Sequence, residues 1–97
     1  MRRDAIVQLL RAQAPTLRER FGACSVSLFG SAARDEMRAD SDVDILVEFD
    51  PPPSLDAYFG MKDYLESVLG RSVDLVTPGG LKPRARRHVE GDLLRVA

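Results

Sequence analysis

The stretch VSLFGSAARDEMRADSDVDILVE, residues 26–48, contains two short hydrophobic runs separated by a polar connection. The first run ends abruptly at Gly30-Ser31, and the second, Ile45-Leu46-Val47, is preceded by two aspartates. Short apolar runs bounded by glycine, serine and aspartate are typical of buried strands. The stretch therefore predicts two strands whose polar ends carry the chemistry of the protein.

Asp42 and Asp44 stand two residues apart at the start of the second predicted strand. Side chains alternate between the faces of a strand, so these two aspartates share one face while Val43, Ile45 and Val47 share the other. Their Cα atoms would lie roughly 6.5–7 Å apart. Like charges this close are unfavourable unless a cation lies between them. The pair therefore predicts a metal site.

Gly30 and Ser31 directly follow the first predicted strand. A glycine allows the backbone to approach a ligand closely, and Ser31 is a good N-cap for a short helix beginning near Ala32. Backbone N–H groups at such a helix start form an anion site suited to phosphate, and Arg34 would add a forked donor. Because glycine-serine turns are common, an ordinary turn remains the alternative to a phosphate site.

Asp74 interrupts a third hydrophobic run, predicted as a strand over residues 72–77. An unpaired carboxylate buried in a core costs several kcal/mol. Asp74 must therefore be exposed, paired or bound to something. An exposed charge on an edge strand, which discourages aggregation, is the simpler alternative to a functional role.

The remaining sequence predicts helices that pack on this sheet. Helical spacing of apolar residues, together with capping residues, favours four further helical segments. They are residues 2–14, residues 16–21 after a break at Pro15 and with Gly22 as the stop, residues 55–69 with Ser54 as N-cap and Gly70 as the stop, and a final helix over residues 81–97 with a break expected at Gly91. In the helix over residues 55–69, Leu55 and Phe59 are expected in the apolar stripe. The whole chain, residues 1–97, is predicted to be one α+β domain, with a small mixed three-stranded sheet and helices mainly on one of its faces.

The bulk composition narrows the possible classes of protein. The 97 residues contain one cysteine, Cys24, and no apolar run approaches the roughly 20 residues needed to cross a bilayer. We therefore expect a cytoplasmic protein without membrane association. The formal net charge is −1, and stable nucleic-acid binding is not expected. The run KPRARR, residues 82–87, is either a solvated helix face or a contact surface for phosphate or an acidic partner.

Taken together, these motifs resemble the catalytic signature of the DNA polymerase β nucleotidyltransferase superfamily, and within it the MNT-type minimal nucleotidyltransferases. The resemblance, which covers about residues 17–87, consists of Gly30-Ser31-x-Ala33-Arg34, then Ser41-Asp42-x-Asp44, then Asp74 on a later strand. Each motif is weak alone, and the specificity comes from their order and spacing. The resemblance implies a palm-like nucleotidyltransferase fold.

The resemblance also implies roles for individual residues. Asp42 and Asp44 would hold two Mg²⁺ ions, and Asp74 would share the ion nearest the attacking hydroxyl. The nucleotide, expected to be ATP, would be bound by Gly30, Ser31, Arg34 and Ser41. Family members usually carry glycine after the arginine, whereas this chain has Asp35. An acid here could repel the triphosphate or lie on the solvent side of the short helix.

MNT-type proteins are commonly paired with a HEPN-domain ribonuclease toxin, and proteins similar to this one transfer AMP from ATP to a tyrosine of that toxin. The resemblance therefore implies a Mg²⁺-dependent nucleotidyltransferase that acts as an antitoxin. A non-catalytic antitoxin that neutralises the toxin by direct binding is the main alternative, supported in the sequence only by Asp35. Modification of a small molecule is a weaker alternative, because the chain hardly has the length to build an acceptor pocket. Tyr58, Phe59 and residues 82–87 are candidate contacts with the partner, and a place in the core is the equal alternative for Tyr58 and Phe59.

Overall fold

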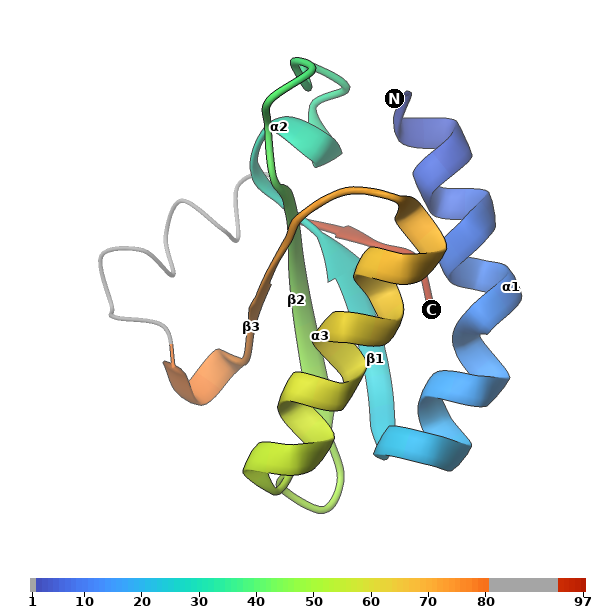
Figure 1. The fold of residues 1–97 in the computed structure, drawn as a ribbon, viewed down its shortest axis with the longest axis vertical. Helices are drawn as coiled ribbons and strands as arrows, with labels where there is room; N and C mark the ends of the chain where they lie inside the picture. Colours follow the sequence, from blue (N-terminus) through green and yellow to red (C-terminus); the bar gives the residue numbers. More distant parts are fainter. Residues whose placement is uncertain (1, 81–92) are drawn as a thin grey trace.

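The computed structural model describes residues 2–80 and 93–97, which form a four-stranded sheet packed against helices (Figure 1). Along the chain the elements are α1 (Arg3–Phe21), β1 (Ala23–Leu28), α2 (Gly30–Ala33), β2 (Val43–Phe49), α3 (Leu55–Leu69), β3 (Val73–Val76), the 3₁₀ turn η1 (Pro78–Gly80) and β4 (Leu94–Arg95). The strand order is β3-β2-β1-β4. Strand β1 is antiparallel to β2 and β4, whereas β2 and β3 are parallel. This mixed sheet confirms the predicted α+β class.

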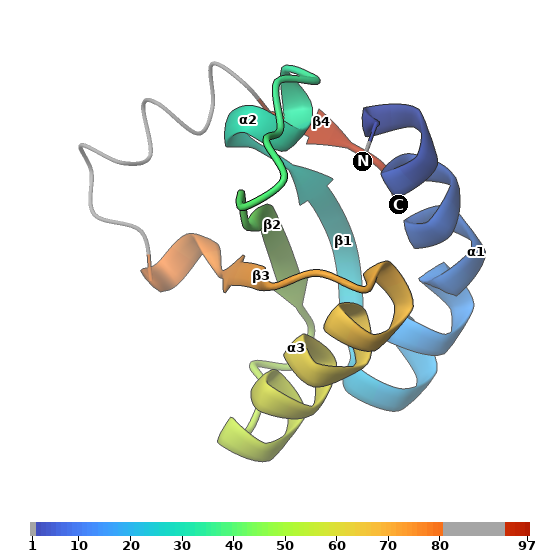
Figure 2. The same cartoon turned by 45° about the horizontal axis from the view of Figure 1, so that its top comes forward.

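Helices α1 and α3 cover the same face of the sheet, as the two views of Figures 1 and 2 show. The alternation predicted for β2 is confirmed, because Val43, Ile45 and Val47 are fully buried beneath these helices. The intervening residues Asp44 and Leu46 are only partly buried. One face of β2 therefore belongs to the core, and the other, which carries Asp44, Leu46 and Glu48, is more open.

The ends of the two long helices follow their predicted capping residues. Gly22 ends α1 with φ of 77°, and Gly70 ends α3 with φ of 67°, a left-handed conformation that glycine adopts at little cost. At the start of α3, the Ser54 hydroxyl accepts a hydrogen bond from the Ala57 N–H at 3.1 Å. Within residues 2–80 and 93–97, none of the helices is both long enough and apolar enough to cross a membrane.

The break expected at Pro15 is wrong, since α1 continues through this residue to Phe21. A proline inside a helix costs about 3 kcal/mol because it removes one backbone hydrogen bond and crowds the preceding turn. Leu10 and Leu17 stand two turns apart on the same face of α1, and both are fully buried. Burying a leucine stabilises a fold by about 1.5–3 kcal/mol, so the two together offset the cost of the proline.

The expectation of three strands and a helix reaching residue 97 is also wrong, because Leu94–Arg95 forms β4 at the edge of the sheet beside β1. The chain end is bound to β1 through hydrogen bonds from Val96 N–H to the Val26 carbonyl and from Val26 N–H to the Ala97 carbonyl, both of 2.9 Å. Unpaired backbone groups of β1 are satisfied in this way. The rest of the predicted final helix, with the basic residues 82–87, lies outside the described residues.

The apolar stripe of α3 differs from the prediction at two positions. Leu55 is 76% exposed and Phe59 is 54% exposed, whereas Met61, Leu65 and Leu69 are buried. The buried residues are spaced by four, and Phe59 stands about 120° around the helix from Leu65 at about 100° per residue. The described part of the fold therefore leaves two large apolar side chains on the surface of α3.

Candidate active site

The parallel pairing of β2 and β3 brings together the acidic residues predicted to form the site. Asp44 and Asp74 are direct partners in the register of the two strands, and such strands lie about 4.8 Å apart. Their neighbours Val43 and Val73 are also paired and are buried on the core face, so the two aspartates share the open face. Asp42 precedes β2 and is exposed. Asp44 and Asp74 therefore lie side by side on the open face, and Asp42 is close enough for its charge to act on Asp44.

The electrostatics of Asp44 reflect this clustering. Burial, followed by the negative charges of Asp74 and Asp42, raises the pKa of Asp44 to about 6, against a lowering effect of the Arg34 guanidinium. A carboxylate that is half-buried beside two others is unfavourable in its charged form. A site of this kind is stabilised by a bound cation, and perturbed carboxylates in such surroundings are typical of functional sites.

The backbone of Gly30 lies directly against the Asp44 carboxylate. Phe29, just before it, donates its N–H to the Asp44 carbonyl at 3.1 Å. A Cβ atom on Gly30 would come closer than 3.0 Å to Asp44 Oδ2, a distance that real Cβ atoms essentially never show. Gly30 also has φ of +64°, in the left-handed region. Both the space and the backbone conformation therefore require glycine here.

Helix α2 begins at Gly30 with Phe29 as its N-cap, so the predicted helix start near Ala32 with Ser31 as the cap is wrong. The physical reason is the left-handed conformation of Gly30, which turns the chain directly at the end of β1. Ser31 is half-buried and lies within the single turn of α2, directly after Gly30, rather than before the helix.

The donor chemistry of the site fits a divalent ion that arrives with a substrate. In the part of the chain that the structure describes, no three side chains of His, Cys, Asp or Glu converge closely enough to form a ready-made metal site. Mg²⁺ prefers oxygen ligands and is usually bound through one or two carboxylates, several waters and the phosphates of the substrate. Asp42, Asp44 and Asp74 supply carboxylate oxygens only. They fit Mg²⁺ bound together with a phosphate-containing ligand.

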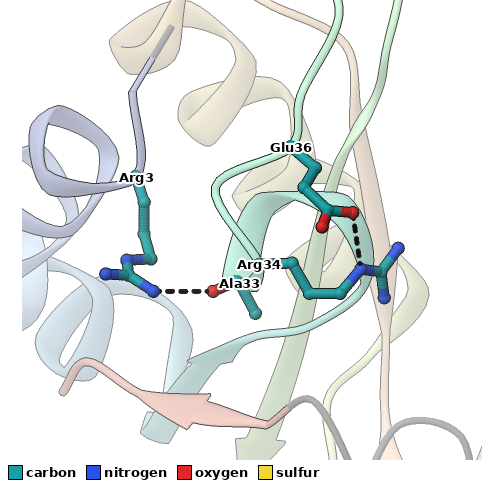
Figure 3. Close-up of polar contacts among 4 residues, drawn as sticks. All are labelled: Arg3, Ala33, Arg34 and Glu36. Atoms are coloured by element: carbon teal, nitrogen blue, oxygen red, sulfur yellow. Dashed lines mark hydrogen bonds and ion pairs between the residues drawn. The ribbon is translucent and has the colours of Figure 1, made fainter.

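Arg34 follows α2 and is the cation whose charge acts on Asp44. Its Nε pairs with Glu36 Oε2 at 3.1 Å, and its side chain is 44% exposed (Figure 3). On the other side of α2, Arg3 donates from Nη1 to the Ala33 carbonyl at 3.1 Å. Arg3 thereby anchors the turn of α2 to the start of α1. Arg34 lies where it can contact an anion beside the carboxylates.

Asp35 has φ of +59°, a conformation in which glycine is favoured and aspartate is among the better-tolerated residues. Its Oδ1 accepts a hydrogen bond from the Arg3 N–H at 2.8 Å. The carboxylate therefore satisfies one of the backbone donors left free at the N-terminus of α1. Of the two alternatives for Asp35, this hydrogen bond favours a structural role over repulsion of a phosphate.

Ser41, predicted to contact the nucleotide, has its hydroxyl in a turn. Ser41 Oγ accepts the Arg38 N–H at 3.0 Å, and Arg38 in turn accepts the Ser41 N–H at 3.1 Å. The Ser41 carbonyl accepts a hydrogen bond from Arg71, which was not among the predicted site residues. The turn ends immediately before Asp42, so Ser41 shapes the entry of the chain into the site.

The raised pKa of Asp44 predicts how pH acts on the metal-free protein. The group binds its proton more tightly in the folded chain, so this contribution to stability is fully present below about pH 4 and is lost as the pH rises through about 6. We expect the melting temperature to fall over this window, and Asp44→Asn to flatten the profile. Thermal melts at intervals between pH 4 and 7 test this. The same slope in Asp44→Asn and in the original protein would contradict it.

A separate apolar groove of about 810 Å³ lies at the other end of β2 and β3. It is lined by the ends of these strands, the proline-rich connection and the start of α3, including Glu48, Pro52, Leu55, Tyr58 and Val76. The Tyr58 hydroxyl donates to the Leu75 carbonyl, which places Tyr58 in the wall of the groove. None of the three clustered carboxylates lines the groove. It is a surface distinct from the acidic site.

Comparison with known proteins agrees with this geometry. Residues 10–96 match the nucleotidyltransferase domain family. The chain is 47% identical over 93 residues to the protein adenylyltransferase MntA of Thermococcus cleftensis, and the match covers 96% of this chain and 94% of that protein. This chain therefore spans nearly the full length of that relative.

Solved structures confirm the predicted fold. A chain assigned to the minimal nucleotidyltransferases matches with a TM-score of 0.81 and 38% identity, over 97% of this chain and 95% of that one. A chain from the complex of tri-AMPylated Shewanella oneidensis HEPN toxin with MNT antitoxin shares the fold, with a TM-score of 0.68 and 22% identity, over 94% and 71% of the two chains. With its fold, its clustered carboxylates and its match over residues 10–96, the chain belongs to the nucleotidyltransferase domain family.

Proposed function

We propose that this chain is a Mg²⁺-dependent adenylyltransferase that moves AMP from ATP to a tyrosine hydroxyl of a partner HEPN toxin, and thereby acts as its antitoxin. The observation that carries the proposal is the pairing of Asp44 with Asp74 on the open face, beside Asp42. The name of the Thermococcus cleftensis relative, a protein adenylyltransferase, and the AMPylated toxin in the Shewanella complex support the choice of donor and acceptor.

In the proposed reaction the acceptor hydroxyl attacks the α-phosphorus of ATP, the bond from that phosphorus to the bridging oxygen breaks, and pyrophosphate leaves. Asp42, Asp44 and Asp74 would hold the metal ions, and a bound pair of Mg²⁺ ions supplies positive charge to the attacking and leaving oxygens. Asp74, on the neighbouring strand, is assigned to the side of the attacking hydroxyl and helps it lose its proton.

The other end of the nucleotide is assigned to α2. The absence of a side chain at Gly30 keeps the backbone open beside Asp44. Ser31 lies in the same turn, and Arg34 follows it with a guanidinium suited to forked contact with phosphate oxygens. In this arrangement the chain's own residues orient the triphosphate, so that the α-phosphorus lies next to the carboxylates.

A protein acceptor is consistent with the surfaces of this small chain. Leu55 and Phe59 are exposed, and Leu55 lines the apolar groove at the end of β2 and β3. Exposed apolar surface next to a groove is typical of sites that bind another protein. We assign this surface of α3 to contact with the partner toxin.

The proposal is tested by incubating the purified protein with ATP, Mg²⁺ and a HEPN-type protein of the same organism, followed by intact-mass analysis of both chains. The expected result is a gain of whole AMP units on the partner, which disappears without Mg²⁺. A stable complex with no gain in mass would contradict transfer and favour neutralisation by binding alone.

Asp35 provides a further test of the phosphate site. Because its carboxylate binds the Arg3 N–H, we expect Asp35→Asn, which keeps the acceptor but removes the charge, to change the KM for ATP by less than about threefold, equivalent to about 0.7 kcal/mol. Asp35→Gly should behave similarly, since it relieves the positive φ while losing the hydrogen bond. Steady-state kinetics measure both. A tenfold fall in KM in both variants would show instead that Asp35 repels the triphosphate.

A further inference from the structure

Arg71 joins the α3–β3 connection to the turn that leads into the acidic site. Its Nη2 donates to the carbonyls of Arg38 at 2.6 Å, Ala39 at 3.1 Å and Ser41 at 2.8 Å. Hydrogen bonds from a charged donor are stronger than those between neutral groups. Three carbonyls 30 or more residues away in the sequence therefore converge on one nitrogen of a single side chain.

The neighbours of Arg71 strengthen this connection. Ser72 accepts the Val43 N–H at 2.9 Å, and Glu66 Oε2 accepts the Val73 N–H at 2.9 Å. The first bond joins the start of β3 to the start of β2, and the second joins β3 to α3. The position of Arg71 is thus fixed by two strands and a helix, which makes it a rigid support for the more exposed turn at residues 38–41.

Asp42 is the residue that this support affects most directly. It follows the turn at residues 38–41 and precedes β2, so no strand pairing holds its own backbone. Asp42 and Arg71 line the same small hollow of about 290 Å³. The three hydrogen bonds of Arg71 all go to backbone carbonyls of the turn, so it is through the backbone of the turn that Arg71 can act on the site.

We propose that Arg71 is a positioning residue that holds the turn at residues 38–41, and with it the carboxylate of Asp42, in the geometry that binds the metal–nucleotide complex. The inference rests on the proposed function. Removal of a group that holds a metal ligand in place, without binding the metal itself, commonly lowers metal affinity or activity by about 10–100-fold. A lysine at this position keeps a charged nitrogen with several N–H donors, as Nη2 of Arg71 has, so it should replace Arg71 in part.

The test compares Arg71→Met and Arg71→Lys with Arg11→Met, a matched control that removes an arginine bound to a backbone carbonyl elsewhere, that of Val96 at 3.2 Å. Two quantities are measured in the full-length protein: the Mg²⁺ concentration that gives half the maximal rate of AMP transfer, and amide hydrogen exchange over residues 38–43. Melting temperatures are recorded for all variants.

We expect Arg71→Met to require about tenfold more Mg²⁺, to recover much of the rate at high Mg²⁺, and to exchange faster over residues 38–43. Arg71→Lys, which keeps a charged donor, should lie between Arg71→Met and the original protein in both quantities. Arg11→Met should leave both quantities unchanged. A merely structural role would lower the melting temperature or the active fraction without moving the Mg²⁺ dependence. Unchanged Mg²⁺ dependence and exchange in Arg71→Met would overturn the inference.

The two proposals fail in different ways. If the original protein transfers no AMP, the proposed function fails, and hydrogen exchange over residues 38–43 still decides whether Arg71 holds the turn. If the original protein transfers AMP and Arg71→Met matches it in both measurements, only the positioning role is lost.

Discussion

Replacing Asp42 and Asp44 together by asparagine should lower the rate of AMP transfer by about 10³-fold or more. Removing a single preorganised electrostatic group from an active site costs about 10²–10³-fold in kcat, and this double change removes two of the three clustered carboxylates. The rate of mass gain on the partner protein, measured at saturating ATP and Mg²⁺, gives the value directly. Transfer within tenfold of the original rate would contradict the assignment of these residues.

The same double variant should be more stable than the original protein when no metal is present. At pH 7 the Asp44 carboxylate is charged beside Asp74 and Asp42, and its raised pKa shows that this charge is unfavourable. A higher melting temperature together with lost activity is the signature of a functional site. Asp40→Asn is the matched control, because Asp40 is an exposed acid in the adjoining turn, and it should change neither quantity.

Replacing Gly30 by alanine should reduce transfer by about 10²-fold, the scale expected when a reacting group is displaced by about 1 Å. The new methyl group would overlap Asp44 Oδ2, so the carboxylate must move away from its position beside Asp74. The left-handed conformation at this position adds about 1–2 kcal/mol to the loss of stability. Kinetics with ATP and a chemical denaturation curve measure the two effects separately.

Gly22→Ala separates the contact from the backbone strain. Gly22 has φ of +77° but lies at the end of α1, where an added Cβ would meet only the Asp50 carbonyl at 3.8 Å, an ordinary contact. We expect Gly22→Ala to lower the free energy of unfolding by about the same 1–2 kcal/mol that the left-handed conformation costs in Gly30→Ala. Its rate of AMP transfer should be unchanged. Equal loss of activity in Gly22→Ala and Gly30→Ala would show that strain alone, and not the displacement of Asp44, causes the effect.

The parts of the fold that could be predicted are those determined by local chemistry. The β-branched residues Val43, Ile45 and Val47 recur at every second position of β2, with Asp44 between the first two, which fixes the buried face of the strand. Glycine and serine at helix ends gave the bounds of α3 directly, because Ser54 supplies a hydrogen-bond acceptor and Gly70 adopts the left-handed conformation. These signals act over a few residues and need no knowledge of the tertiary structure.

The features that could not be predicted depend on contacts between distant segments. Strand β4 has only two residues, and it exists because β1 offers an unpaired edge. The continuation of α1 through Pro15 depends on the burial of Leu10 and Leu17 against the sheet, which outweighs the local preference for a break. A short strand and a tolerated proline leave little trace in the sequence around them.

In the candidate site, too, the features set by local sequence could be predicted and those set by distant contacts could not. Asp42 and Asp44 could be paired from their spacing alone, whereas the position of Asp74 beside Asp44 follows from the parallel register of β2 and β3. Arg71 gave no local signal, since its partners at residues 38–41 precede it by 30 or more positions. For Asp35 the structure adds a physical reason, a positive φ, for the glycine that the resemblance led us to expect at this position.

The central claim is that the carboxylates on the open face of β2 and β3 bind a divalent ion together with a nucleotide. Electron paramagnetic resonance of Mn²⁺, used in place of Mg²⁺, measures this binding without any turnover or partner protein. We predict weak binding by the protein alone, tighter binding with a non-hydrolysable ATP analogue, and loss of both in the Asp42→Asn/Asp44→Asn variant. Equal Mn²⁺ binding by the variant, or no binding by the original protein with the analogue present, would contradict the claim.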